Sequence, residues 1–415
     1  MKVAVVPIYC ASDPRVTRYY KDRIRLVMSN VLSFFHDQSG GRAEIEYRIL
    51  NWVNLPYSEQ EWVDLGFNAG PTITPIVEQR LNVSLSPFDA IILLIDTPNS
   101  HEGVVAADRK HIHISASSFS PSLVSHHLAF LFAGMIADRL DGDRTVIGGD
   151  SYCIMGESAY RRAYIDHDLA LWFLGRVAGE AETHAKCGPG FSVPNLIARG
   201  WFDFSYGINV PRSDSEPVSV TEMTLWPLQG APLPSQNVKV CAFLTSIADP
   251  HELITVEFRR GTIPGGHWDG HWDRALPARS IVIHSANFLG PRPFCLQIGE
   301  LSFVDNAESR PSIFVERAGY LLTVARIGED WFGDYWIGLE FEPRVEVPHW
   351  THLKDIEGGD DMGMLPLGGV FGLIVEITNL QAEPGYDDEE IVSISPAAGS
   401  LVRRNTTVYV TVNRN

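Results

Sequence analysis

The sequence predicts an α/β N-terminal part, an all-β sandwich after it, and a small α+β unit at the C-terminus. Strand-like and helix-like stretches alternate up to about residue 200, which is typical of an α/β domain. From about 215 to 345 the pattern changes to short strands separated by turn residues, which favours a β-sandwich. A stretch rich in Gly and acidic residues, 346–364, then indicates a linker. We therefore expect domains at 1–212, 213–347 and 348–415.

The elements of the N-terminal part follow from hydrophobic periodicity. Strands are predicted at 3–9, 43–53, 88–96 and 110–117, and helices at 13–41, 74–84 and 123–140. The first helix should end at Gly40-Gly41, a typical helix-terminating signal. The continuous apolar run at 88–96 predicts a central strand, whereas the alternation at 110–117 predicts an edge strand. The almost entirely apolar stretch 123–140 predicts a buried helix.

Composition excludes several classes of function. The net charge of −18 argues against nucleic acid and against anionic membrane surfaces as partners. No stretch reaches the roughly 18 apolar residues that a membrane span requires. The N-terminus reads as a strand rather than a signal peptide, so a cytoplasmic location is expected, with release by a non-signal route left open. The five cysteines are odd in number and form no C-x-x-C pair, which predicts buried, reduced thiols.

Five segments resemble, in order, parts of metzincin metallopeptidases of the gametolysin and immune-inhibitor-A kind. They are FFHDQSGGRAEIEYRILNWVNLP (34–56), FDAIILLIDTP (88–98), SHHLAFLFAG (125–134), GGDSYCIMGES (148–158) and GPGFSVPNLIARGWFD (188–203). The stretch 253–284 also resembles their β-rich C-terminal portion. The resemblance implies that 125–134 stands in place of the zinc helix, and that Met155 and Gly156 form the core of the Met-turn.

The zinc motif of that family is degenerate in this chain. In H-E-x-x-H, residues i and i+4 share a helix face and bind one zinc ion, while the Glu activates the bound water. The resemblance places His126 at the first ligand and His127 at the general base. Phe130 then stands at the second ligand and Ile136 at the third. These substitutions predict a pseudoenzyme with no catalytic residues, no metal and no cofactor.

Other metal sites stay open as alternatives. His111 and His113 are two apart on a predicted strand and so face the same side. Either one, together with His126, would give an active zinc peptidase with an atypical site. The acidic runs 358–361 and 385–390 lack EF-hand spacing, and a weak calcium site is the alternative to solvated loops.

The doubled H-W-D sequence at 267–273 is a further candidate binding site. Its residues are His267, Trp268, Asp269, His271, Trp272 and Asp273. Imidazole and carboxylate groups suit a cation, and the indole rings suit stacking on a sugar. The resembling peptidases have a related structural turn here, so we favour a packed loop between two strands.

The C-terminal stretch 365–413 resembles a PASTA domain. The matching positions are Ile394, Pro396, Gly399, Val402, Thr407, Val408 and Val410. The tight Pro-x-x-Gly turn requires Gly399, because glycine accepts positive φ. The resemblance implies an adaptor or docking role, with cell-wall glycan as an alternative ligand.

The sequence thus predicts a catalytically inactive metallopeptidase-like protein with a binding or structural role. An inert peptidase fold retains a cleft beside an edge strand, which can hold an extended chain by strand addition. We therefore expect a protein partner. The two alternatives are an active zinc metallopeptidase and a subunit of a larger extracellular or injection-type assembly.

Overall fold

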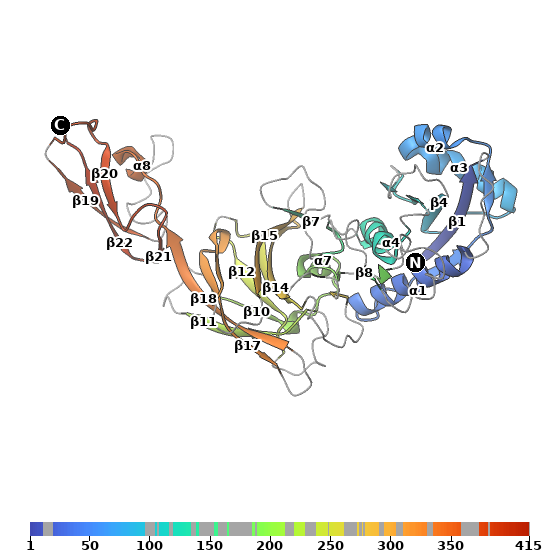
Figure 1. Cartoon of the computed structure of the whole chain (residues 1–415), viewed down its shortest axis with the longest axis horizontal. Coiled ribbons are helices and arrows are strands. Elements are labelled where there is room, and N and C mark those ends of the chain that lie inside the picture. The colour runs from blue at the N-terminus through green and yellow to red at the C-terminus, as the bar shows by residue number, and fades with distance from the viewer. Residues whose placement is uncertain are drawn as a thin grey trace. The chain divides into compact units, whose positions relative to one another are not determined.

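The computed structural model describes most of the 415 residues (Figure 1). The described ranges are 1–10, 20–95, 104–105, 108–115, 119–133, 138–140, 153–156, 164–165, 185–186, 189–211, 220–228, 238–247, 249–260, 272–273, 276, 279–289, 294–303, 310–329, 335–357, 373–380 and 382–414.

Contacts between Cα atoms divide the chain into two compact units. The first contains Met1–Gly207, Pro227–Cys241 and Thr255–Val304. The second contains Ile208–Trp226, Ala242–Ile254 and Asp305–Asn415. The three-domain boundaries at 1–212, 213–347 and 348–415 stay a prediction from the sequence.

The N-terminal sheet has the strand order β2-β1-β4-β6-β5, with β3 beside β1. Its strands are β1 (Lys2–Cys10), β2 (Glu46–Ile49), β3 (Val53–Leu55), β4 (Ala90–Ile95), β5 (Val104–Val105) and β6 (His111–Ser115). All pairings are parallel except that of β5 with β6. The central place of β4 is as predicted. The edge position predicted for β6 was wrong, because the two-residue β5, too short to recognise in the sequence, lies outside it.

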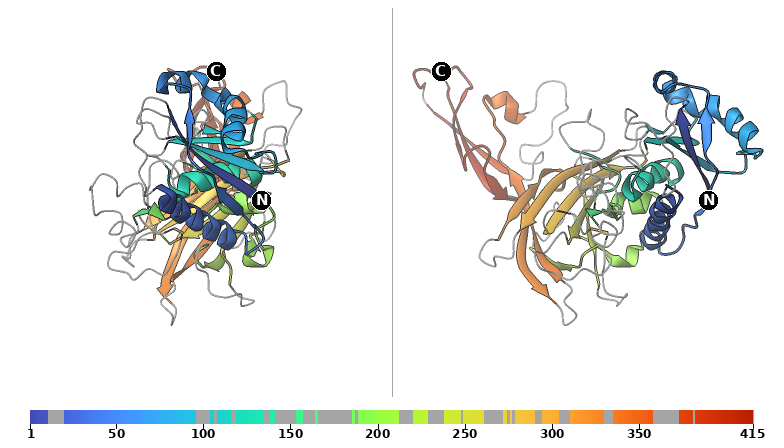
Figure 2. Two further views of the ribbon diagram at one scale, coloured as in Figure 1. Left: turned by 90° about the vertical axis from the view of Figure 1, so that its right-hand side faces the viewer. Right: turned by 45° about the vertical axis from the view of Figure 1, so that its right-hand side comes forward.

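Helices cover both faces of this sheet (Figures 1 and 2). They are α1 (Tyr20–Gln38), α2 (Glu59–Leu65), α3 (Ala69–Leu81) and α4 (Pro121–Leu128), with the 3-10 turn η1 (Gly66–Asn68) between α2 and α3. On one face, α2 and α3 pack on alternate residues of β1 and β4 to form a buried core. On the other face lie α1 and α4, which contact each other. Helix α1 ends before Gly40 and Gly41, both at positive φ, as predicted.

The helix predicted over 123–140 is shorter than expected. Its α-helical part ends at Leu128, and a π-helical turn, η2, follows at Ala129–Ala133. Residues 138–140 form strand β7 (Asp138–Leu140), which pairs in parallel with residues Cys295–Gln297. Apolar composition alone does not show where a buried α-helix ends, because an α-helical and a π-helical turn can carry the same apolar side chains.

Two further sheets are built from the β-rich middle of the sequence. One has the order β10-β12-β13-β14-β15-β7 and the other β11-β18-β17-β16, with β21 (Leu401–Arg403) beside β18. The strands are β10 (Gly207–Asn209), β11 (Thr221–Leu225), β12 (Cys241–Thr245), β13 (Leu253–Arg259), β14 (Arg279–Asn287), β15 (Phe294–Phe303), β16 (Ser312–Val315), β17 (Tyr320–Glu329) and β18 (Tyr335–Glu346). The predicted abundance of short strands is confirmed, whereas their stacking as a sandwich stays a prediction.

Short elements complete the first unit and link strands in the second. They are β8 (Tyr164–Ile165), β9 (Ala185–Lys186), α7 (Val193–Ala198), and the 3-10 turns η4 (Phe204–Tyr206) and η5 (Glu316–Ala318). The four cysteines within the described ranges are buried and form no disulfide. Among the helices that the structure describes, none has the length and apolar character that a membrane span would need.

The C-terminal part of the second unit contains a three-stranded sheet and a short helix. The sheet has the order β19-β22-β20, and β22 is parallel to β19 and antiparallel to β20. The elements are α8 (Leu353–Glu357), β19 (Ile374–Asn379), β20 (Ile391–Ser395), β21 (Leu401–Arg403) and β22 (Thr407–Val412). The Pro396-x-x-Gly399 turn has Gly399 at φ +79°, which confirms the predicted need for glycine.

Candidate functional site

The segment that resembles a zinc helix is deeply buried. Helix α4 begins with Ser120, whose hydroxyl accepts the backbone N–H of Leu123, and with Pro121 at its first turn. Every residue of α4 is buried, including both histidines. Helix α4 is therefore a core helix on the face of the sheet that it shares with α1.

His126 is hydrogen-bonded to the Met-turn-like segment. Its Nδ1 lies 2.9 Å from the carbonyl oxygen of Ile154. A carbonyl only accepts, so Nδ1 carries the hydrogen and Nε2 is the basic nitrogen of the ring. Burial lowers the pKa of His126, and the hydrogen bond to Ile154 opposes this only in part. The ring is therefore neutral near pH 7.

His127, which the resemblance places at the general base, is also buried. Its ring lies edge-on to that of His126, with centroids 5.1 Å apart. Burial, and then the neighbouring His126, hold the pKa of His127 well below its usual value. An imidazole that is so weakly basic is a poor replacement for the carboxylate that the zinc motif requires.

Phe130 does not occupy the core, contrary to the expectation for a helix that is buried on all sides. Its side chain is 42% exposed, and it lies in the π-helical turn that follows α4. A π-helical turn closes i to i+5 hydrogen bonds, so a spacing of four no longer returns to the same face. Ile136, which the resemblance places at the third ligand, lies outside the described residues.

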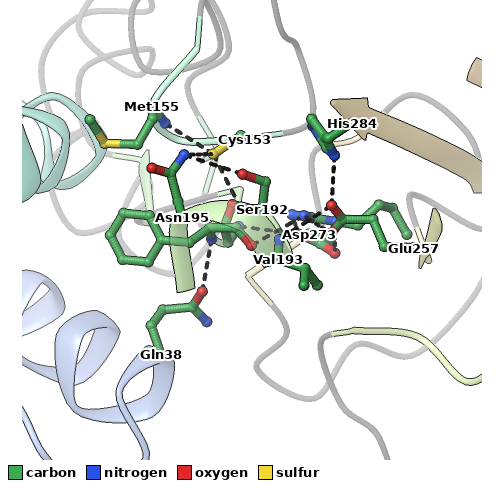
Figure 3. A network of polar contacts seen from close by, with 12 residues as sticks. Gln38, Cys153, Met155, Ser192, Val193, Asn195, Glu257, Asp273 and His284 are labelled. Carbon is green, nitrogen blue, oxygen red and sulfur yellow. Dashed lines mark hydrogen bonds and ion pairs between the residues drawn. The ribbon is translucent and has the colours of Figure 1, made fainter. Parts of the chain in front are cut away.

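The structure brings the Met-turn-like segment and α4 together. Residues 153–156 form a tight turn in which the N–H of Gly156 donates to the carbonyl of Cys153 at 2.9 Å. Cys153, Ile154 and Met155 are buried. The sulfur of Cys153 accepts N–H groups from Met155 at 3.4 Å and from Ser192 at 3.2 Å (Figure 3). Two segments that the sequence singled out separately are therefore neighbours.

His111 and His113 face away from α4. The ring of His111 contacts Asp108, and its Nε2 lies 2.8 Å from the hydroxyl of Thr74 on α3. The ring of His113 packs against Trp62 on α2, with centroids 5.4 Å apart. Burial, and then the charge of His111, lower the pKa of His113 to about 4. Helices α2 and α3 lie on the face of the sheet opposite to α4. The rings of His111 and His113 therefore do not come together with the ring of His126.

The H-W-D segment is used, as far as it is described, inside the protein. Trp272 packs edge-on against Phe34 with ring centroids 5.2 Å apart. Asp273 is buried and binds Arg259 through both carboxylate oxygens, at 2.5 and 2.7 Å. These two side chains therefore pack inside the protein. The candidates His267, Trp268, Asp269 and His271 lie outside the described residues.

Arg259 is the centre of a buried polar network that the sequence interpretation missed. Figure 3 labels its acidic partners Glu257 and Asp273. The guanidinium of Arg259 contacts Asp273, Glu257 at 3.1 Å, and the carbonyl oxygens of Gly190 and Phe191. Burial disfavours its charge, but Asp273 and then Glu257 outweigh that effect and raise the pKa of Arg259. The signal was available, because Glu257 and Arg259 are two apart on a strand and share a face.

The same network reaches two further elements of the first unit, β14 and α1. Glu257 lies 2.7 Å from His284 on β14, and Gly190 donates its N–H to Asp273 at 3.1 Å. Gln38, at the end of α1, accepts the N–H of Phe191 at 2.8 Å. The network therefore fixes residues 190–193 between α1, β13 and β14, which is a structural role.

Within the described ranges, no group of three or more His, Cys, Asp or Glu side chains is placed to hold a metal ion. The acidic run 358–361 lies outside these ranges, whereas 385–390 lies within them. Comparison with models of protein families gave no match, and comparison with curated protein sequences gave none either. The resemblances to metzincin peptidases and to PASTA domains stay predictions from the sequence.

Proposed function

We propose that this chain is a catalytically inactive metallopeptidase-like protein that binds a protein partner. The proposal rests on the side chains at positions 126, 127 and 130 and on their surroundings. His126 donates to the carbonyl of Ile154, while the other two positions hold a weakly basic, buried imidazole and a partly exposed phenyl ring. Adjacent helical residues point about 100° apart, so His127 does not supply the ligand that Phe130 lacks.

The edge of the N-terminal sheet supports a role in binding. Among the strands that the structure describes, β5 is the outermost one next to β6, and it is antiparallel to β6. An edge strand offers backbone N–H and C=O groups to an extended segment of another chain. This is the mode of binding that we propose for the partner.

Catalytic inactivity can be tested with an unfolded protein substrate such as reduced casein. We expect no cleavage by the purified full-length protein, with or without added zinc, and no stoichiometric metal by elemental analysis. The double variant His127→Glu with Phe130→His restores the H-E-x-x-H motif. Elemental analysis of this variant shows whether the restored motif binds zinc. Chelator-sensitive cleavage by the wild type that is lost in His126→Ala would contradict the proposal.

A further inference from the structure

A pocket of about 340 Å³ lies in the first unit, and neither His126 nor Ile154 lines it. It is lined by aromatic rings from three separate segments, namely Phe35, Phe132 and Trp201. The guanidinium-bearing residues Arg42 and Arg199 line it too. Its volume is within the lower range of small-ligand sites, which are mostly apolar with a few placed polar groups.

The aromatic side of the pocket is held rigidly. Phe35 lies edge-on to Trp201, with centroids 6.1 Å apart at 89°. Both rings also contact the buried Phe191, each at 6.0 Å between centroids. Phe191 is fixed in turn by its N–H bond to Gln38. The pocket wall is therefore preorganised, which reduces the entropy that a ligand would lose on binding.

The two arginines are positioned by the ends of two helices. Helix α7 is followed by a turn in which Gly200 adopts φ +72°. Arg199 and Trp201 are the residues directly before and after this glycine. After α1, Gly40 and Gly41 turn the chain at positive φ, and Arg42 follows them. The Nη1 of Arg42 donates to the carbonyl of Gly200 at 2.6 Å, which joins the two turns.

The pocket carries excess positive charge on an acidic chain. Among the residues that the structure describes, neither Arg42 nor Arg199 forms an ion pair with a carboxylate. The nearby Asp203 accepts the N–H of Ser205 at 2.9 Å, and this hydrogen bond together with the smaller effect of the Arg42 charge lowers the pKa of its carboxyl group, so Asp203 balances the charge of Arg42 in part. Glu44 also lines the pocket, so two guanidinium groups face one carboxylate. This local charge differs in sign from the net charge of −18.

We propose that this pocket binds a peptide segment in which an aromatic side chain lies next to a carboxylate. The aromatic wall takes the ring, because edge-to-face contacts favour such pairs. The guanidinium groups of Arg42 and Arg199 take the carboxylate, since planar N–H donors match its two oxygens. The inference rests on the proposed function in one respect, namely that the carboxylate belongs to a protein partner.

Binding of short peptides to the full-length protein tests the pocket, with isothermal titration calorimetry as the readout. The probe is an N-acetylated Gly-Gly-Gly-Phe peptide with a free terminal carboxylate. Its C-terminal amide and its Gly-Gly-Gly-Ala counterpart are the comparisons. We expect both changes to weaken binding by about tenfold or more, the loss typical of one charge-assisted hydrogen bond or one buried ring.

Matched variants locate the binding. Arg42→Gln and Arg199→Gln should each weaken binding of the phenylalanine peptide about tenfold. Arg48→Gln, an exposed arginine on β2 outside the pocket, should leave affinity unchanged. Both pocket arginines are exposed, so neither change should impair folding, and circular dichroism checks this.

Each contrary result overturns a defined part of the inference. Absence of binding, or equal binding of the acid and the amide, excludes a carboxylate site. Binding that Arg42→Gln and Arg199→Gln leave unchanged places the peptide elsewhere. If free N-acetylphenylalanine binds and the peptide does not, the ligand is a small acid rather than a protein segment. Peptidase activity would contradict the proposed function alone, because these titrations do not depend on it.

Discussion

The imidazole Nδ1 of His126 lies 2.9 Å from the carbonyl oxygen of Ile154, and this hydrogen bond joins α4 to the turn at 153–156. Metal-binding histidines commonly donate their second ring nitrogen to a backbone carbonyl, which orients the ring. Here the same orienting bond is present in a helix whose neighbouring positions do not suit zinc. The bond therefore contributes to packing between two buried segments.

His126→Ala should destabilise the first unit. The change removes the donor to a buried carbonyl and opens a cavity, at a cost of about 1–3 kcal/mol in the free energy of unfolding. Urea denaturation followed by fluorescence measures it. His36→Ala is the control, since the side chain of His36 is 71% exposed, and it should change stability little. Equal stability of His126→Ala and wild type would show that the bond to Ile154 contributes nothing.

Stability should decrease as the pH falls below the ordinary pKa of histidine. His113 has a pKa of about 4 in the folded protein, compared with its usual value of 6.5, so the unfolded chain binds its proton first. The free energy of unfolding should therefore drop between pH 6.5 and 4, by up to about 1.4 kcal/mol per pH unit for this group, and should not depend on it above pH 6.5. The pKa values of His126 and His127 are lowered too, which adds to the same trend.

The His113→Gln variant isolates this group. Its stability curve between pH 6.5 and 4 should be less steep than that of the wild type. His36→Gln is the control, and its curve should follow the wild type. An unchanged slope in His113→Gln would show that other groups cause the acid sensitivity.

The buried pair of Arg259 and Asp273 should be far more important for folding than an exposed pair. Arg259→Met leaves the carboxylates of Asp273 and Glu257 buried without their cation, and about 3–5 kcal/mol of stability should be lost. Arg310→Met is the matched control, because its pair with Glu340 is partly exposed to solvent, and loss of this pair should cost under about 1 kcal/mol. Similar losses in both variants, by guanidinium chloride denaturation, would contradict a structural role for the network.

Gly70→Ala should destabilise α3, although alanine is the better helix former. A Cβ at this position would lie 2.6 Å from the Cβ of His111, which is held by Asp108 and Thr74. The steric cost of about 1–3 kcal/mol should exceed the roughly 1 kcal/mol gained in helix propensity. Thr72→Ala, at an exposed position of the same helix, should stabilise slightly instead. A Gly70→Ala protein that is as stable as the wild type would show that His111 can move aside.

Local features of the sequence predicted local structure well. The continuous apolar run at 88–96 is the central strand β4, because a strand that is covered on both faces needs apolar side chains on both. The glycines after α1 and in the Pro396-x-x-Gly399 turn adopt positive φ, which few other residues accept. In each case the physical cause acts within a few residues of the signal.

Sequence reasoning failed where distant segments decide the environment. We expected β6 at the edge of the sheet, but β5 pairs with its outer side. The burial expected for Phe130 assumed a continuous α-helix, whereas a π-helical turn begins at Ala129. Glu257 and Arg259 are two apart on one strand, but no short-range pattern connects them with the other members of the network, which are Gly190, Asp273 and Gln38.

The sequence by itself determined the succession of elements and the identity of the residues at 126, 127 and 130, because periodicity and side-chain chemistry are local properties. Only the tertiary structure decided which of these residues meet. It placed His126 on Ile154, turned His111 and His113 to the opposite face of the sheet, and brought Arg42 beside Gly200. The reason is that strand order and helix docking depend on contacts between residues far apart in the chain, and burial of the whole core selects them together.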